Sequence, residues 1–278
     1  MPTISTNGIE MYYEQYGSGE PLVLIMGWGG NAATWRPQIP GLAQRFQLTV
    51  FDNRGVGRTS APDAPFSTAQ MAGDVAGLMD TLGIERAHVL GISLGGMVAQ
   101  ELAIANPERV GALILGCTTP GGNRSAGIDR LRDDIAQFRE TFAEQGPDLE
   151  WFSDFLKRLW TDEALLRSES ALQDFVLSII RFPPAPHGLR RQADAVHAHD
   201  AFDRLSSLAA PTLVITGDED GLIDPENSAI LADAIPEAEL CVFPRLRHAF
   251  HLERPDLVNP VIIDFIYRAG IKLDPSSS

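Results

Sequence analysis

The stretch HVLGISLGGMVAQ, residues 88–100, decides the fold, because it begins as a buried strand would and continues as a helix would. Residues 88–93 form an apolar run without polar alternation, which is typical of a strand covered on both faces. Ser93 stands at the join, with Gly91 two residues before it and Gly95 two residues after it. A tight strand-to-helix turn strains its central residue and requires very small neighbours. The stretch therefore predicts a sharp turn that exposes the hydroxyl of Ser93 at the end of a strand.

Similar apolar runs and helical stretches alternate along most of the chain. Asn7-Gly8 joins two short strand-like segments and is a strong signal for a tight hairpin turn. Further strands are predicted at 21–26, 46–51, 110–117, 211–217 and 239–243, and helices at 67–83, 96–107 and 225–236. This order predicts an α/β fold with a mostly parallel, doubly wound sheet and an N-terminal hairpin.

The alternation breaks between residues 120 and 205, where four stretches have helical periodicity and none resembles a strand. A helical insertion between two core strands is expected to lie over the carboxyl ends of the strands, where ligands bind. We therefore predict a core of residues 1–119 and 206–278 and a helical cap of residues 120–205. Most aromatic residues of the cap should pack its helices together, and we select Trp151 and Phe155 as candidates that face a cleft.

Composition excludes several classes of function. The 278 residues carry a formal charge of −15, whereas nucleic-acid binding needs clustered Lys and Arg. No secretory signal and no apolar run of about 20 residues is found, so we expect a cytoplasmic protein without a membrane partner. Cys117 and Cys241 lie in strand-like runs, which predicts buried free thiols. We expect a monomer or a homodimer.

Residues 91–95 match the G-x-S-x-G pattern of a nucleophile elbow, and the strand before and helix after it are the required context. A serine nucleophile needs a base, and the base needs an acid that orients it. Asp218, Asp220 and Asp224 follow the predicted strand 211–217, and two histidines follow the last strand. The chain order Ser, Asp, His is that of elbow-type hydrolases.

These motifs resemble the α/β-hydrolase fold family over nearly the whole chain apart from the cap. In that family the acid follows its strand in the pattern G-x-x-D-x-x-x-P, and Gly217, Asp220 and Pro225 come close, with the proline one residue late. The resemblance implies Asp220 as the acid. Asp218 and Asp224 remain alternatives. If neither is the acid, Asp218 is typical of a turn residue and Asp224 of a helix cap.

The resemblance also implies which histidine is the base. His248 precedes a short apolar stretch and then Glu253 and Pro255, as in the family pattern G-x-G-H followed by E-x-P. His251 is interpreted as a packed or rim histidine. Arg245 and Arg247 replace the small residues that usually precede the base. A nearby cation would lower the pKa of His248; the alternative is no effect, because adjacent side chains on an extended chain point apart.

The segment LIMGWGGN, residues 24–31, resembles the H-G-x-G-G segment that supplies the family's oxyanion hole. Carried over, the backbone N–H groups of Trp28 and Leu94 would be the two donors, and Met26 stands where many members have histidine. The indole of Trp28 either forms a wall of the acyl pocket or packs against other side chains of the protein. Our tentative substrate-binding residues are Trp28, Trp151, Phe155 and His251.

No cofactor and no metal is expected. The segment 51–62 resembles the family's D-x-R-G-x-G-x-S loop but lacks the third glycine and following helix of a dinucleotide site. Asp52 and Arg54 are therefore interpreted as structural. His197 and His199 lie in a helical stretch, where i and i+2 side chains point to different faces, which disfavours a metal site.

The resemblance implies a serine hydrolase for small or medium carboxylic esters or lactones, similar to small-molecule carboxylesterases, 3-oxoadipate enol-lactonases and antibiotic methyl esterases. The same three residues could instead serve a cofactor-free haloperoxidase or perhydrolase, or a hydrolase of carbon–carbon bonds. A hypothesis from another class is a weakly catalytic ligand receptor. Fold alone does not separate these functions.

Overall fold

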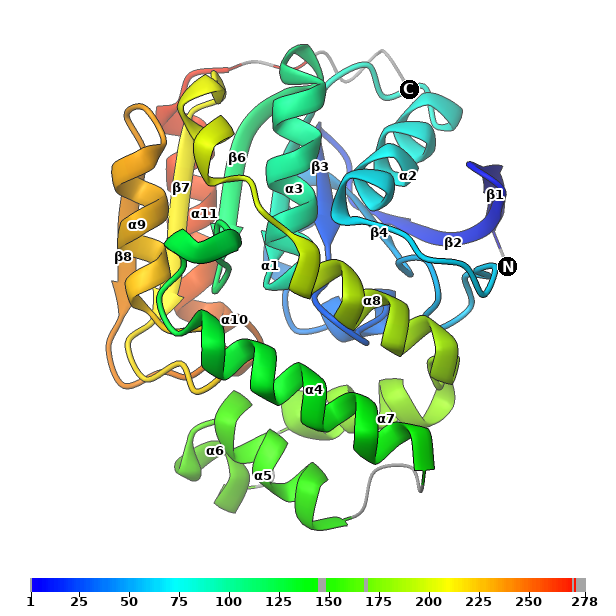
Figure 1. Ribbon diagram of the computed structural model, residues 1–278. Coiled ribbons are helices and arrows are strands. Elements are labelled where there is room, and N and C mark those ends of the chain that lie inside the picture. Colours follow the sequence, from blue (N-terminus) through cyan, green and yellow to red (C-terminus); the bar gives the residue numbers. More distant parts are fainter. Residues whose placement is uncertain (1, 145–148, 168–169, 272, 274–278) are drawn as a thin grey trace.

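The central sheet has eight strands in the order β1-β2-β4-β3-β5-β6-β7-β8, in a computed structural model that describes residues 2–144, 149–167, 170–271 and 273 (Figure 1). The strands are β1 Thr3–Thr6, β2 Ile9–Tyr16, β3 Glu20–Ile25, β4 Phe46–Phe51, β5 Ala87–Ile92, β6 Val110–Gly116, β7 Thr212–Gly217 and β8 Glu239–Phe243. β2 runs antiparallel to β1 and β4, and all other neighbours are parallel. The predicted fold class is confirmed.

Local sequence determines the N-terminal hairpin, and the strand order creates a point at which the chain changes direction across the sheet. Asn7 and Gly8 both have positive φ, 43° and 75°, as a two-residue hairpin turn requires. From β3 the chain moves to β4 on one side and then crosses to β5 on the other side of β3. Ligands of open α/β sheets bind outside the carboxyl ends of the strands at such a point.

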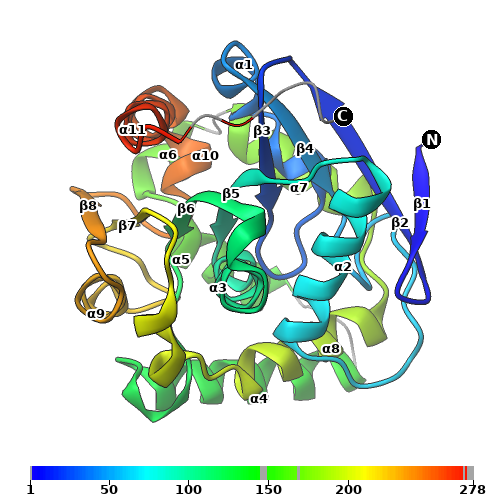
Figure 2. The same ribbon diagram turned by 90° about the horizontal axis from the view of Figure 1, so that it is seen from above.

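Helices cover both faces of the sheet (Figure 2). One apolar core joins α2 Thr68–Thr81, α3 Leu94–Ala105 and α9 Glu226–Ala234 to one face, and a second joins α1 Ile39–Leu42 and α11 Pro255–Arg268 to the other. Short elements complete the core: η1 Ala32–Trp35, η2 Pro107–Arg109, η3 Gly122–Arg124, η4 Phe202–Ser207 and α10 Phe250–Glu253.

Within the described part of the chain, five α-helices between β6 and β7 lie across the carboxyl ends of the strands, and we call them the helical insertion (Figure 1). They are α4 Ile128–Glu144, α5 Leu149–Leu159, α6 Asp162–Arg167, α7 Ser170–Arg181 and α8 Pro186–Ala198. One of the four stretches with helical periodicity, residues 164–182, coincides with parts of α6 and α7, and its residues 168–169 lie outside the described residues. The division of the chain into a core and a cap at 120 and 205 stays a prediction.

The last strand departs from expectation. β8 was expected to be covered on both faces, but it is the edge of the sheet, and Leu240 and Val242 are 43% and 47% exposed. Cys117 and Cys241 are free thiols as predicted, although Cys241 on β8 is only half-buried. Among the described helices, none is both long and apolar enough to cross a membrane.

The loop after β4 fixes the segment that follows β3. Asp52 accepts hydrogen bonds from the backbone N–H groups of Ala32 and Arg58, each at 2.7 Å. The guanidinium of Arg54 forms a buried bidentate pair with Asp74 of α2, at 2.7 and 2.6 Å. Burial raises the pKa of Asp74, and Arg54 offsets part of this effect. Both residues of the loop therefore have the structural role assigned to them.

Candidate active site

Ser93 occupies a strained turn between β5 and α3. Its φ of 56° and ψ of −121° are unusual for a residue with a side chain and cost about 1–3 kcal/mol. The Ser93 N–H donates to the carbonyl of Gly116 at 2.8 Å, which ties the turn to β6. A Cβ added at Gly91 would lie 2.3 Å from the carbonyl oxygen of Gly95, and one at Gly95 would lie 2.0 Å from that of Ile25. The turn therefore fits the sheet only with glycine at both positions.

His248 and Asp220 form a buried hydrogen-bonded pair at the carboxyl ends of β7 and β8. The Nδ1 atom of His248 lies 2.7 Å from Oδ2 of Asp220. The other carboxylate oxygen, Oδ1, accepts the N–H groups of Leu222 and Ile223 at 2.8 and 3.0 Å. The carboxylate is thus fixed by its own loop and holds the imidazole in one orientation.

The two alternative acids lie elsewhere in the same loop region. Asp218 accepts the backbone N–H of Arg245 at 2.5 Å. Asp224 accepts the N–H of Glu226 at 3.0 Å, at the beginning of α9. Of the three carboxylates, it is Asp220 that contacts His248.

The surroundings of His248 favour its charged form. Burial disfavours the imidazolium and is the largest single influence, but the adjacent carboxylate of Asp220 and the Cys117 side chain together outweigh it and raise the pKa of His248 well above 6.5. Of the two alternatives for Arg247, the one without an effect on this pKa agrees with the structure. The guanidinium of Arg247 points away and donates to the carbonyls of Lys157 and Trp160, at 2.7 and 2.9 Å.

Cys117 lies beneath the imidazole at the end of β6. Its thiol contacts the backbone carbonyl of His248 at 3.5 Å, and burial raises the pKa of Cys117. The possible ligand atoms of Cys117, Asp220 and His248 lie within 4.8 Å of one another. Because Nδ1 is bonded to the carboxylate and the thiol is kept neutral, this cluster is better suited to positioning the imidazole than to binding a metal.

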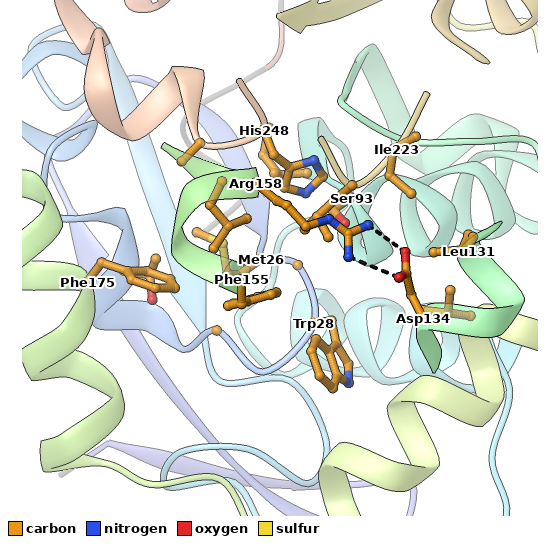
Figure 3. Close-up of a pocket in the computed structure, with 18 of the residues that line it drawn as sticks. Met26, Trp28, Ser93, Leu131, Asp134, Phe155, Arg158, Phe175, Ile223 and His248 are labelled. Carbon is orange, nitrogen blue, oxygen red and sulfur yellow. Dashed lines mark hydrogen bonds and ion pairs between the residues drawn. The ribbon is translucent and has the colours of Figure 1, made fainter. Parts of the chain in front are cut away.

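Ser93 and His248 line a common cavity of about 590 Å³ between the sheet and the helical insertion (Figure 3). Its wall is largely apolar and includes Met26, Trp28, Leu131, Phe155, Phe175 and Ile223. This volume is in the usual range of small-molecule sites, about 300–1,000 Å³.

The structure also locates the tentative substrate-binding residues. Trp28, Phe155 and His251 all line the cavity, whereas the side chain of Trp151 lies outside the described residues. The indole of Trp28 donates to the carbonyl of Leu189 in α8 at 3.0 Å and packs edge-on against Phe155, with the ring centroids 6.2 Å apart. Trp28 thus both walls the cavity and supports the helical insertion.

The segment after β3, which was expected to supply the oxyanion hole, lies directly against the serine. A Cβ added at Gly27 would be 3.1 Å from the Cβ of Ser93, so glycine permits this approach. The side chain of Asn53 donates to the carbonyl of Met26 at 2.8 Å and holds the segment in place. Leu94 is the first residue of α3, and the first N–H groups of a helix have no intrahelical acceptor.

A charged pair in the cavity wall was not anticipated from the sequence. Arg158 of α5 forms a bidentate pair with Asp134 of α4, at 3.0 and 2.5 Å, and its Nε donates to the carbonyl of Gly221 at 2.8 Å (Figure 3). It therefore links two helices of the insertion to the residue after Asp220. No motif marks this pair, because it depends on how the helices pack.

Comparison with known proteins agrees with this geometry. A family model described as the alpha/beta hydrolase fold matches residues 20–255. The chain belongs to this family. Among solved structures, the chain is similar to the enol-lactonase from Burkholderia xenovorans LB400, with a TM-score of 0.85 and 26% identity. The match covers 96% of this chain and 100% of the enol-lactonase chain.

Curated relatives above 30% identity carry different names. The chain is 31% identical to the "Putative carbamate hydrolase RutD" of Azorhizobium caulinodans, over 95% of this chain and 98% of the relative. It is 32% identical to the "Putative non-heme bromoperoxidase BpoC" of Mycobacterium tuberculosis, over 92% of this chain and 97% of the relative. The α/β-hydrolase family and a hydrolase-type enzyme are therefore established, whereas the relatives differ in the substrates that their names give.

Proposed function

We propose that this α/β-hydrolase is a serine hydrolase that cleaves small to medium carboxylic esters or lactones through an acyl-enzyme on Ser93. The observation that carries the proposal is the geometry at one cavity. A serine with strained backbone and an imidazole–carboxylate pair, contributed by three distant parts of the chain, all meet there.

In the proposed reaction, Ser93 Oγ attacks the substrate carbonyl while Nε2 of His248 takes its proton. The C–O bond to the leaving alcohol then breaks, and His248 returns the proton to that alcohol. A water molecule, deprotonated by His248, attacks the acyl-enzyme and releases the carboxylic acid and free Ser93. Asp220 keeps the proton of neutral His248 on Nδ1, which leaves Nε2 free to act as the base.

The negative oxygen of each tetrahedral intermediate would accept hydrogen bonds from the backbone N–H groups of Trp28 and Leu94. Loss of one such donor typically lowers kcat by about 100- to 1,000-fold. The close approach of Gly27 to Ser93 and the position of Leu94 at the beginning of α3 support this assignment. The positive end of the helix dipole favours the same charge.

The substrate class follows from the cavity. Its aromatic and aliphatic wall favours a mainly apolar substrate, and a volume of about 590 Å³ suits a small or medium molecule. The similarity to an enol-lactonase supports lactones within this class. The name of the RutD relative makes carbamates, which also undergo acyl transfer at a carbonyl, worth including in a substrate panel.

Perhydrolysis is the second candidate, and the similarity to BpoC favours it. Hydrogen peroxide would replace water in the attack on the acyl-enzyme and would yield a peracid. A comparison of acid and peracid formation at increasing peroxide concentration separates the two reactions.

A panel of esters, lactones and carbamates, assayed with the wild type and with Ser93→Ala, tests the proposal. We expect at least one ester or lactone to be turned over, a loss of about 1,000-fold or more in the variant, and labelling of Ser93 in the wild type by a fluorophosphonate. Binding of substrates without turnover would favour the receptor hypothesis. Comparable turnover by the folded variant would exclude the acyl-enzyme.

A further inference from the structure

His251 is a buried polar side chain that the proposed reaction does not use. It lies on α10, three residues after His248, lines the cavity and is only 3% exposed. Neither of its ring nitrogens has a hydrogen-bond partner among the described residues. A buried donor or acceptor without a partner costs about 1–3 kcal/mol, and an apolar side chain would fill the space without this cost. The ring is therefore expected to have a partner that is not part of the protein.

The neighbours of His251 leave its polar atoms available. Its ring packs against Trp35 and Phe250, with centroids 5.8 and 5.5 Å away. Thr34, next to Trp35 in the chain, also lines the cavity, but its hydroxyl contacts Ser178 Oγ at 3.4 Å and the N–H of Asn31 at 3.3 Å. On this wall the hydroxyl of Thr34 is thus bonded to the protein, whereas both ring nitrogens of His251 lack a partner among the described residues.

The imidazole meets its ligand in the uncharged state. Burial, with a smaller contribution from His248, lowers the pKa of His251 to about 3. A neutral imidazole offers one N–H donor and one acceptor nitrogen. Such a pair suits a hydroxyl group, which can both donate and accept, or a carbonyl group, which accepts.

The charges around the cavity point to the same kind of ligand. Its described lining includes three carboxylates: Asp134 is paired with Arg158, Asp154 is 66% exposed and paired with Lys157, and Glu150 is exposed. The lining guanidinium of Arg158 is thus already paired, and an anionic substituent would find no free Lys or Arg side chain among the described lining residues. An uncharged oxygen needs no such counter-charge.

We propose that His251 is a specificity-determining residue that hydrogen-bonds an uncharged hydroxyl or carbonyl oxygen of the substrate, apart from the carbonyl that Ser93 attacks. This inference rests on the proposed ester or lactone hydrolysis. It narrows the substrate to a mainly apolar ester or lactone with one further neutral oxygen.

Four esters followed in a pH-stat test the proposal. Ethyl butyrate is the plain reference, ethyl 3-hydroxybutyrate carries a hydroxyl in the acyl part, 2-hydroxyethyl butyrate carries one in the alcohol part, and monoethyl succinate carries a carboxylate. The readout is the ratio of kcat/KM for each substituted ester to that for ethyl butyrate. This ratio is insensitive to the fraction of folded enzyme.

We expect the wild type to prefer at least one hydroxylated ester over ethyl butyrate and to disfavour monoethyl succinate. His251→Leu should lower the preferred ratio about 10-fold, the value of one neutral hydrogen bond at the upper end of its range. His251→Gln, which keeps a donor and an acceptor, should restore most of the ratio. His197→Leu, a histidine exposed on α8, is the matched control and should leave the ratio unchanged.

The outcomes separate this inference from the proposed function. If the wild type turns over ethyl butyrate but shows no preference for either hydroxylated ester, the inference is wrong and the hydrolase proposal stands. The same follows if His251→Leu keeps the wild-type ratio. Should His251→Leu fail to fold, the ratios of the wild type and of His251→Gln still decide. If the folded wild type turns over none of the four esters, this inference is overturned, whereas the hydrolase proposal is overturned only if the wider panel of esters, lactones and carbamates also shows no turnover.

Discussion

Asp220→Asn is the substitution whose effect can be worked out most fully. In the wild type, one carboxylate oxygen faces Nδ1 of His248 at 2.7 Å and the other accepts the N–H groups of Leu222 and Ile223. Asparagine has a single acceptor oxygen. If its NH₂ group faced the two backbone donors, both would lose their acceptor, at about 1–3 kcal/mol each. The oxygen therefore stays on the backbone, and the NH₂ group faces the imidazole.

This orientation places the ring proton on the wrong nitrogen. Nδ1 of His248 must then accept a hydrogen bond, so the proton of the neutral ring moves to Nε2, which can no longer accept the proton of Ser93. The equivalent change in a serine protease lowers kcat by about 10⁴-fold, because the imidazole is held in the wrong tautomer. We expect a loss of similar size here, with a melting temperature near that of the wild type.

The pH dependence of kcat/KM tests the same reasoning independently. The active form has a neutral imidazole, so activity rises with pH through the pKa of His248, which Asp220 holds above 6.5. Removal of the negative charge lowers this pKa, and the acid limb of kcat/KM should move to lower pH in Asp220→Asn. Asp218→Asn and Asp224→Asn change the charge equally but do not touch the imidazole, and they should leave the limb in place. The reasoning is refuted if Asp220→Asn retains more than about a tenth of wild-type activity, or if its acid limb does not move.

Four further substitutions test the turn at Ser93, the loop after β4 and the surroundings of His248. Gly95→Ala places a Cβ 2.0 Å from a backbone oxygen and should reduce activity and lower the free energy of unfolding by about 1–3 kcal/mol. In the control Gly73→Ala, on α2, the added Cβ meets only an ordinary contact at 3.5 Å, so the free energy of unfolding should rise by about 0.5–1 kcal/mol. Urea unfolding measures both. Arg54→Met leaves the buried carboxylate of Asp74 unpaired and should lower the free energy of unfolding by about 3–5 kcal/mol, and wild-type stability would contradict this. Arg247→Ala should leave the acid limb of the pH–rate profile unshifted, because its guanidinium contacts α5 and not the imidazole, and a clear shift would restore the rejected electrostatic role.

Local signals allow much of the fold and the central residues to be predicted from the sequence. The turn at Asn7-Gly8 and the bend at Ser93 each require a particular backbone geometry, and glycine or asparagine at fixed positions reveals it. The order of strands and helices then determines which loops meet at the carboxyl ends of the sheet. This is why the order of elements places the loops that carry Asp220 and His248 at the same edge, whereas the choice of these two residues over Asp218, Asp224 and His251 comes from the family resemblance.

The rest depends on packing between elements that are distant in the chain. The pair of Arg158 with Asp134 requires the crossing of α4 and α5, and the direction of Arg247 requires the end of α5 to lie beside it. Neither has a short-range signature. The exposure of β8 likewise follows from its place at the edge of the sheet, which an apolar run such as residues 239–243 does not specify.

The contacts of α5 connect substrate range with chemistry. At its C-terminal end the carbonyl of Leu159 accepts the N–H of Ala249, next to His248, at 2.8 Å. On its cavity side Arg158 donates to Gly221, next to Asp220. A helix that walls the cavity is thus hydrogen-bonded to the neighbours of both residues of the imidazole–carboxylate pair. Substitutions on this helix that reshape the pocket are therefore expected to shift the base and its acid as well, through the backbone carbonyl of Leu159 on one side and the side chain of Arg158 on the other.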